Sequence, residues 1–333
     1  MPEITGTTGL TALLGHPVAH SISPQMHNEA FRLLDLDYRY LAFDVTPEEL
    51  PAVVAGLKAI HIRGFNLTMP HKTAILPLVD ELTDAARLAG AVNTVINEDG
   101  HLIGHTTDGI GYMRSVTDAG HNIIGKTMTL LGAGGAATAI CVQAALDGVA
   151  AIHMFKRKNL TWDDTKAFTE RISKETGCPV MLHDINDPAV LGSCLKESAI
   201  VTNATNVGMA PDTAASVVPK ELLFPELIVS DIIYNPKETL LLQQAKACGC
   251  PVFNGLYMLL YQGAASFECW TGREMPTAVI KEKYFSNKLF MLTYPNFAVF
   301  YRILADGAQS SANKSFIKDS QKFPFLRTCK WPR

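Results

Sequence analysis

The residues of this chain that could do chemistry lie where apolar runs end. The run "GFNLTM" (64–69) is followed by Pro70, His71 and Lys72, so a cationic side chain lies just after the carboxyl end of a predicted strand. Ligands of open α/β sheets bind beyond the carboxyl ends of the strands. Small hydroxyl, amide and carboxylate groups occupy the same kind of position elsewhere: Ser21, Ser23, Asn66, Thr68, Asn93, Thr94 and Asp108. Together these groups favour a small, polyhydroxylated, anionic ligand.

A glycine-rich turn indicates a second binding site. The segment "MTLLGAGGAATAI" (128–140) carries the pattern G-x-G-x-x-A at Gly132, Gly134 and Ala137, after a predicted strand and at the start of a predicted helix. The first glycine permits a tight turn, the second lets the backbone approach a pyrophosphate, and the small third residue permits close packing. Free N–H groups at a helix start favour phosphate. The segment therefore predicts dinucleotide binding.

The next predicted strand ends in "HMFKRKN" (153–159), where the choice between NAD and NADP is usually made. A strict NAD site places an acidic residue there for the ribose 2′-hydroxyl. This chain has Lys156, Arg157, Lys158 and Asn159 instead. The cations favour the 2′-phosphate of NADP. The alternative is that they are solvated and that Asn159 bonds the ribose.

The elements that must position these residues alternate between strand and helix patterns, which is typical of a mostly parallel sheet covered by helices. "LAFDV" (41–45) and "GFNLTM" predict buried strands, "DELTDAARLAG" (80–90) predicts a helix, and "AVNTVINEDGHLIGH" (91–105) predicts a hairpin. The expected fold is α/β with two domains. We expect a mostly parallel substrate domain over 1–107, closed by helices from 250–285, and a Rossmann-type domain over 108–249.

The composition restricts the function classes. The chain has 333 residues, 47% of them hydrophobic, and a net charge of −3, so nucleic acid is not an expected partner. Seven scattered cysteines without a C-x-x-C pair, and histidines without ligand spacing, predict no disulfide framework and no metal site. We expect no signal peptide, no membrane partner and a cytoplasmic protein. The oligomeric state is open, with a homodimer as one alternative.

The last 48 residues differ from the rest. Residues 286–333 carry eight Lys or Arg and two Asp, a formal charge of +6. They are rich in aromatic residues, and the strand–helix alternation is lost. We expect an appended basic tail outside the core.

Eight collinear segments resemble the shikimate dehydrogenase family, including its quinate/shikimate dehydrogenase branch. The resemblance covers residues 1 to about 285. The segments are "GHPVAHSISPQMHNEAF" (15–31), "GFNLTMPHK" (64–72), "LAGAVNT" (88–94), "TTDGIG" (106–111), "GAGGAA" (132–137), "TNATNVGM" (202–209), "SDIIYNP" (230–236) and "NGLYMLLYQGAASFECWTG" (254–272).

This resemblance implies NAD(P)-dependent oxidation of shikimate, or of quinate as the main substrate, and a role for each matching residue. Lys72 and Asp108 would be the catalytic pair, with Asp84 near the nicotinamide. The expected substrate contacts are Ser21, Ser23, Thr68, Asn93, Tyr234 and Gln262. The expected cofactor contacts are Gly132, Ala133, Gly134, Gly135, Ala136, Lys156, Arg157, Lys158, Asn159, Ile232 and Gly255.

The chain also departs from the family pattern. Thr106-Thr107-Asp108 stands where the family usually has Asn-Thr-Asp. "FKRKNLTWDD" (155–164) lacks the Asn-Arg-Thr of strictly NADP-dependent members, which favours the NAD-using or dual-specificity branch. Since the charge argument favours NADP, the cofactor stays open as NADP or NAD. A non-catalytic dinucleotide-sensing module is the alternative from another class.

Overall fold

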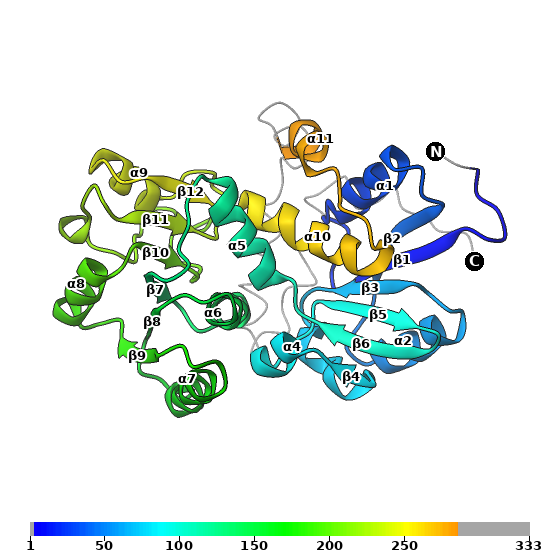
Figure 1. Ribbon diagram of the computed structural model, residues 1–333, viewed down its shortest axis with the longest axis horizontal. Coiled ribbons are helices and arrows are strands. Elements are labelled where there is room, and N and C mark those ends of the chain that lie inside the picture. The colour runs from blue at the N-terminus through cyan, green and yellow to red at the C-terminus, as the bar shows by residue number, and fades with distance from the viewer. Residues whose placement is uncertain (1–2, 286–333) are drawn as a thin grey trace, which may run out of the picture. The chain divides into compact units, whose positions relative to one another are not determined.

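The computed structural model describes residues 3–285, and within them the chain forms two six-stranded sheets. The first sheet has the order β2-β1-β3-β5-β6-β4 and the second has the order β12-β11-β10-β7-β8-β9 (Figure 1). The strands of the first sheet are β1 (Gly9–Gly15), β2 (Tyr38–Asp44), β3 (Gly64–Leu67), β4 (Glu81–Leu82), β5 (Thr94–Glu98) and β6 (His101–His105). Those of the second are β7 (Thr127–Leu131), β8 (Ala151–Lys156), β9 (Val180–Asp184), β10 (Ile200–Asn203), β11 (Ile228–Asp231) and β12 (Val252–Asn254).

Helices cover these sheets and connect the strands. They are α1 (Ser23–Leu33), α2 (Leu50–Ala59), α3 (His71–Ala74), α4 (Asp84–Ala89), α5 (Asp108–Asp118), α6 (Gly135–Leu146), α7 (Trp162–Thr176), α8 (Pro188–Glu197), α9 (Leu240–Ala247), α10 (Leu256–Thr271) and α11 (Thr277–Ile280). Single turns occur at Leu76–Leu78, Lys220–Leu222 and Lys281–Phe285. In residues 3–285 no helix is both long and apolar enough to cross a membrane.

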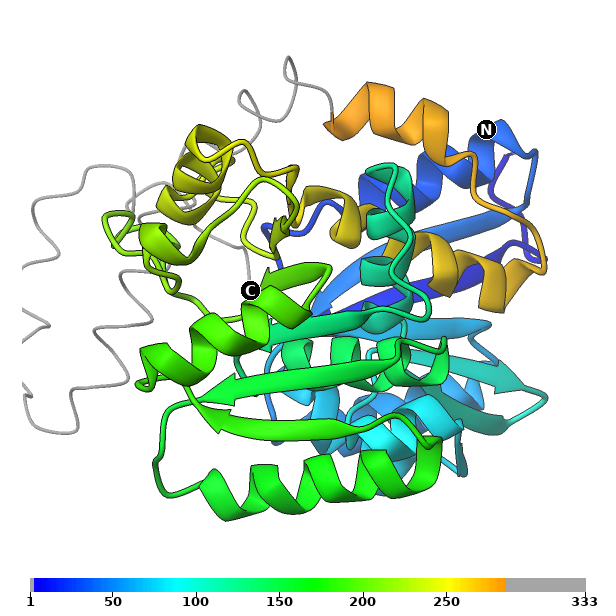
Figure 2. The same ribbon diagram turned by 60° about the vertical axis from the view of Figure 1, so that its left-hand side comes forward.

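The second sheet is parallel throughout and has the strand order of a dinucleotide-binding fold. Its inner strands are buried on both faces, which explains why they are rich in apolar residues. One core cluster includes Met154 of β8 and Ile172 of α7, and another includes Phe155 of β8 and Leu191 of α8. The helices α7 and α8 accordingly lie on opposite faces of this sheet (Figure 2). This arrangement confirms the expected α/β fold class with a Rossmann-type sheet.

The first sheet is mixed because a hairpin enters it. β1 pairs in parallel with β2 and β3, whereas β5 is antiparallel to both β3 and β6. The predicted hairpin over 91–105 is therefore confirmed. The strand carboxyl ends of β1 and β3 lie beside the start of β5, so that polar groups from distant parts of the sequence meet there.

Two local predictions were wrong. The segment 80–90 is not one helix, because Glu81 and Leu82 pair with β6 and the helix begins only after Thr83, whose side chain caps it. The "LAFDV" strand is only partly buried. It is an edge strand, and 49% of Leu41 and 37% of Phe43 stay exposed. The predicted tail, 286–333, lies outside the described residues.

The helices α5 and α10 lie side by side and link the segments that carry the two sheets (Figure 1). A Cβ added at Gly111 of α5 would lie 2.6 Å from the backbone nitrogen of Gln262 in α10, so only glycine allows this approach. The indole nitrogen of Trp270, near the end of α10, donates a 3.0 Å hydrogen bond to the carbonyl of Val95. α10 is thereby held against both α5 and the first sheet.

Candidate active site

Lys72 lies in the short helix α3, directly after β3. The preceding residue, His71, is fully buried, and its Nε2 lies 2.7 Å from the carbonyl oxygen of Val45. The carbonyl of Lys72 accepts a 2.8 Å hydrogen bond from the backbone N–H of Val92. The His71 side chain and the Lys72 backbone are thus both held by hydrogen bonds. These bonds limit the positions that the Lys72 ammonium can reach.

The ammonium of Lys72 reaches Asp108, the first residue of α5. Its Nζ lies 2.5 Å from Oδ2 of Asp108, and the other carboxylate oxygen accepts a 3.0 Å hydrogen bond from Nδ2 of Asn93. The side chain of Asp108 is 13% exposed and that of Lys72 is 32% exposed. The carboxylate is therefore held from two sides, while the ammonium stays accessible to a ligand.

Asn93 joins this pair to α10. Its Nδ2 lies 2.9 Å from Oγ1 of Thr107 and 3.3 Å from Oε1 of Gln262, while its Oδ1 accepts a 2.7 Å hydrogen bond from the backbone N–H of Thr107. Four residues that the sequence singles out, from four separate segments, are therefore in one hydrogen-bonded group: Lys72, Asn93, Asp108 and Gln262. An amine, a carboxylate and two amides in one place suit a ligand with hydroxyl groups.

A buried polar layer supports this group. The sequence analysis singled out Asn66 and Thr94 as strand-end groups, but it assigned no role to Ser266 or Tyr40. Oγ of Ser266 lies 2.8 Å from Oγ1 of Thr94, 2.9 Å from Nδ2 of Asn66 and 3.2 Å from Oγ1 of Thr107. The hydroxyl of Tyr40 donates to Oδ1 of Asn66 at 2.8 Å. One signal for Ser266 was available, because it follows Gln262 by four residues and so shares its helix face.

The predicted serine contacts lie in the segment that opens α1. Ser23 is buried, its backbone N–H donates to Oγ of Ser21 at 3.2 Å, and its side chain is hydrogen-bonded to Tyr40. Burial raises the pKa of Tyr40, which keeps the phenol neutral. Ser23 is therefore connected through Tyr40 to the buried polar layer.

Two other predicted contacts lie near this serine segment. Thr68 follows β3, and its methyl group would be 2.3 Å from a Cβ on Gly15, the last residue of β1. Tyr234, from the loop after β11, packs against the apolar cluster that contains Ile22, between the two serines. A residue from the second sheet's connections thus contacts the cluster that covers the first sheet.

The glycine turn has the geometry that its pattern predicts. Gly132 has φ of +114°, and a Cβ there would lie 2.7 Å from the carbonyl oxygen of Ala204, so glycine is required. Gly134 is the N-cap of α6 and Gly135 its first residue. Among the described residues, no atom lies within 4 Å of a Cβ added at either position. Gly134 and Gly135 are exposed and Ala136 is half-buried, so the start of α6 is open to solvent, while half-buried Ala133 packs against the core beneath.

The cations after β8 differ in what they contact. Nζ of Lys156 donates to the carbonyl of Thr161 at 2.6 Å and to Oγ1 of Thr165 at 2.9 Å. Nζ of Lys158 lies 5.5 Å from the centre of the Trp162 ring. Oδ1 of Asn159 accepts a 3.2 Å hydrogen bond from the N–H of Thr161, the N-cap of α7, and Arg157 is exposed. In this structure the Lys156 ammonium is engaged within its own loop, whereas the Arg157 guanidinium faces solvent.

The residues expected near the nicotinamide differ in their surroundings. A Cβ on Gly255 would lie 1.8 Å from the carbonyl oxygen of Ile232, so these two residues are in direct backbone contact. Asp84 is 82% exposed in its side chain and pairs with Arg87 at 3.1 Å on the helix surface.

Asp231, which the sequence prediction did not single out, holds the backbone beside Ile232. Its carboxylate accepts hydrogen bonds from Nδ2 of Asn203 at 3.1 Å, from Oγ1 of Thr239 at 2.7 Å and from the backbone N–H of Ile233 at 3.0 Å. Burial raises its pKa to about 6 despite these donors. The carboxylate thereby connects β10, the loop after β11 and the N-cap of α9.

Two family models match the chain. Residues 13–95 match the shikimate dehydrogenase substrate binding domain, and residues 255–283 match the shikimate 5′-dehydrogenase C-terminal domain. The NADP(+) shikimate dehydrogenase of Listeria monocytogenes serotype 4b is 53% identical over 281 residues, which are 84% of this chain and 97% of that protein. The chain belongs to the shikimate dehydrogenase family. The sequence resemblance is thereby confirmed.

Two further comparisons extend the match. A quinate/shikimate dehydrogenase of Escherichia coli (strain SMS-3-5) is 43% identical over 84% of this chain and 98% of its own length. The crystal structure of shikimate 5-dehydrogenase from Listeria monocytogenes in complex with shikimate and NAD has a TM-score of 0.82 and 53% identity, and the match covers 85% of this chain and 98% of that one. The Listeria structure therefore shares the fold described above.

Proposed function

We propose that this chain is a dehydrogenase that interconverts shikimate and 3-dehydroshikimate reversibly with NADP or NAD. The observation that carries the proposal is the contact between Lys72 and Asp108, at 2.5 Å, in a chain that belongs to the shikimate dehydrogenase family. A dinucleotide-sensing module without catalysis would have no use for an accessible ammonium held by a mostly buried carboxylate.

The pair accounts for both halves of the reaction. In the oxidation of shikimate, the hydride leaves the carbinol carbon for C4 of the nicotinamide, and the amine of Lys72 accepts the hydroxyl proton as the ketone forms. In the reduction, the ammonium returns the proton and stabilises the developing alkoxide. Asp108 hydrogen-bonds the same hydroxyl and orients the lysine, and Asn93 holds the carboxylate in place.

The substrate carboxylate and its remaining hydroxyls need neutral donors and acceptors. We assign the substrate carboxylate to the hydroxyls of Ser21 and Ser23. Hydroxyl groups can donate hydrogen bonds to this anion, so Lys72 stays available for the reacting hydroxyl. The ring hydroxyls are assigned to Thr68, Asn93, Tyr234 and Gln262. Replacing Ser23 by alanine should raise KM for shikimate by about 10-fold or more, since a hydrogen bond to a charged group contributes about 1.5–3 kcal/mol.

The dinucleotide is assigned to the carboxyl edge of the second sheet. The N–H groups of residues 132–136 would bind the pyrophosphate at the start of α6, and the joined backbone of Ile232 and Gly255 would border the nicotinamide. In this proposal, residues 1–107 with helices from 250–285 are the substrate domain and residues 108–249 the cofactor domain.

We assign the choice of cofactor to Arg157, because Lys156 is engaged with Thr161 and Thr165. Arg157→Ala should lower kcat/KM for NADP⁺ by about 10- to 100-fold, the value of a charge-assisted hydrogen bond, and leave NAD⁺ almost unchanged. Lys166→Ala is the matched control, because Lys166 is an exposed lysine of α7 that lies 4.0 Å from Glu170, and it should change neither. Equal losses with both cofactors in the Arg157 variant would exclude this role.

One experiment tests the proposed function as a whole. The purified protein is assayed with shikimate or quinate, each with NADP⁺ or NAD⁺, by the absorbance of the reduced cofactor. We expect turnover of shikimate, in keeping with the higher identity to the NADP(+) shikimate dehydrogenase than to the quinate/shikimate dehydrogenase. Quinate turnover exceeding that of shikimate would assign the second candidate, and no turnover in any combination would refute the dehydrogenase. A cytoplasmic location and a homodimer stay predictions.

A further inference from the structure

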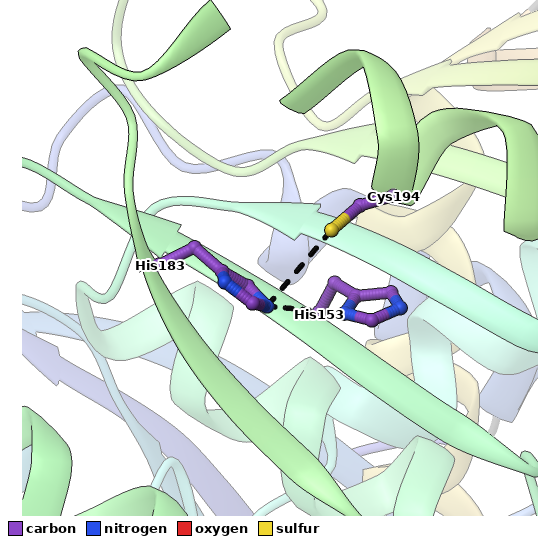
Figure 3. A group of neighbouring side chains, drawn as sticks. All are labelled: His153, His183 and Cys194. Atoms are coloured by element: carbon purple, nitrogen blue, oxygen red, sulfur yellow. Dashed lines mark hydrogen bonds between the residues drawn. The ribbon is translucent and has the colours of Figure 1, made fainter. Parts of the chain in front are cut away.

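Two histidines and a cysteine meet on one face of the second sheet. They are His153 of β8, His183 of β9 and Cys194 of α8, whose side chains converge in Figure 3. Nδ1 of His153 lies 3.1 Å from Nε2 of His183, and Sγ of Cys194 lies 3.9 Å from the same Nε2. The three candidate donor atoms all lie within 4.8 Å of one another.

The parallel sheet explains why these residues meet. β8 and β9 are neighbours, with His153 opposite Met181 and Phe155 opposite His183, so both imidazoles project from the same face. α8 covers this face, since Cys194 and Phe155 belong to one core cluster. His153 and Cys194 are buried, and His183 is half-buried, which leaves a route from solvent.

We propose that His153, His183 and Cys194 bind a zinc ion through Nδ1, Nε2 and Sγ, with water in the fourth position. In a tetrahedral site with Zn–N bonds of about 2.0–2.1 Å and a Zn–S bond of about 2.3 Å, neighbouring donors lie about 3.3–3.6 Å apart. The separations of 3.1 Å and 3.9 Å lie on either side of this range, so small side-chain rotations suffice. One soft sulfur with two imidazoles suits zinc better than magnesium or calcium.

A carboxylate lies close to one of the proposed histidine ligands, where it can hydrogen-bond the ring nitrogen that does not bind the metal. Oε2 of Glu197, one turn after Cys194 in α8, lies 3.6 Å from Nε2 of His153, the ring nitrogen that faces away from the cluster. A carboxylate at that nitrogen holds the proton there and leaves the lone pair of Nδ1 for the metal.

Zinc binding would release one proton, from the Cys194 thiol. The Cys194 S–H bond breaks, its proton passes to solvent, and the sulfur forms the bond to zinc while both imidazoles bind as neutral ligands. The ion would tie edge strand β9 and helix α8 to β8. Because the candidate catalytic residues Lys72 and Asp108 contact none of these groups, we expect zinc to stabilise the fold with little effect on kcat.

The test compares the full chain with Cys194→Ser and Cys248→Ser variants. Cys248 is a partly exposed thiol in α9's C-cap and serves as the matched control. Each protein is treated with a chelator, re-equilibrated with stoichiometric Zn²⁺ and desalted, and its zinc content and melting temperature are measured. Wild type and the Cys248 variant should retain stoichiometric zinc and melt at a higher temperature with it, whereas the Cys194 variant should retain none.

Cobalt identifies the ligands on the wild-type protein, so the test does not depend on a variant folding. Bound Co²⁺ should give a thiolate charge-transfer band and the intense visible bands of a tetrahedral site. Glu197→Gln keeps all three ligands and should weaken zinc affinity by about 10- to 100-fold. Failure of the wild type to retain zinc, absence of the thiolate band, or equal zinc retention by the Cys194 variant would each overturn the proposal.

Discussion

Replacing Lys72 by methionine removes the ammonium but keeps most of the aliphatic stem. In the structure that ammonium lies 2.5 Å from Asp108, whose carboxylate has Asn93 as its other side-chain donor. If Lys72 transfers the proton, kcat for shikimate oxidation should fall by about 10²- to 10⁴-fold. At 1.36 kcal/mol per factor of ten, this is about 2.7–5.4 kcal/mol of transition-state stabilisation.

The double variant with Asp108→Asn makes this prediction sharper. If the two groups act as a unit on one hydroxyl, either single change disables it, and the double variant should be about as slow as Lys72→Met alone. Independent contributions of the same size would instead multiply to about 10⁴- to 10⁸-fold. The rates are measured in single-turnover reactions, and cofactor affinity is measured separately by fluorescence titration, where we expect little change.

The Lys58–Asp80 ion pair provides the matched control. It has a similar geometry, with Nζ 2.8 Å from Oδ2, but both side chains are more than a third exposed. Lys58→Met should leave kcat unchanged and alter the free energy of unfolding by about 0–1 kcal/mol. A lower rate could also result from unfolding, so the melting temperature of Lys72→Met is measured as well. A folded Lys72 variant with wild-type kcat, or a double variant with fully multiplicative losses, would refute the coupled pair.

Further predictions concern the glycines and a buried carboxylate. Gly134→Ala meets no atom within 4 Å, so it should melt like the wild type and yet raise KM for the cofactor. Gly255→Ala would place a Cβ 1.8 Å from a carbonyl oxygen and should lower the free energy of unfolding by about 1–3 kcal/mol or more, measured by urea titration. Hydrogen bonds from Arg32 and Lys283 lower the pKa of Glu29 to about 2 from 4.5. This carboxylate therefore stabilises the fold above about pH 4.5, and its contribution is lost as pH falls towards 2. Glu29→Gln should be less stable than wild type at neutral pH, and the difference should shrink in that window. A constant difference would contradict this assignment.

The amino-acid sequence alone determined the elements whose signals are local. The pattern at Gly132 and Gly134 predicted a strand, a turn and a helix start, because the positive φ of Gly132 and the N-cap position of Gly134 belong to one short turn. The hairpin over 91–105 followed from two alternating runs around a turn. Lys72 and Asp108 could be nominated as strand-end groups and by family resemblance, although 36 residues separate them.

Tertiary structure decided which distant groups touch. Ser266 joins the buried polar layer only because α10 packs against the first sheet, some 170 residues after Thr94. The ammonium of Lys156 turns to Thr161 and Thr165 through side-chain rotation that no residue pattern encodes. His153, His183 and Cys194 are separated by 30 and 11 residues, so no ligand spacing is visible in the sequence. They meet because strand register and helix packing are set by the whole sheet, whereas propensity and turn chemistry act over only a few neighbouring residues.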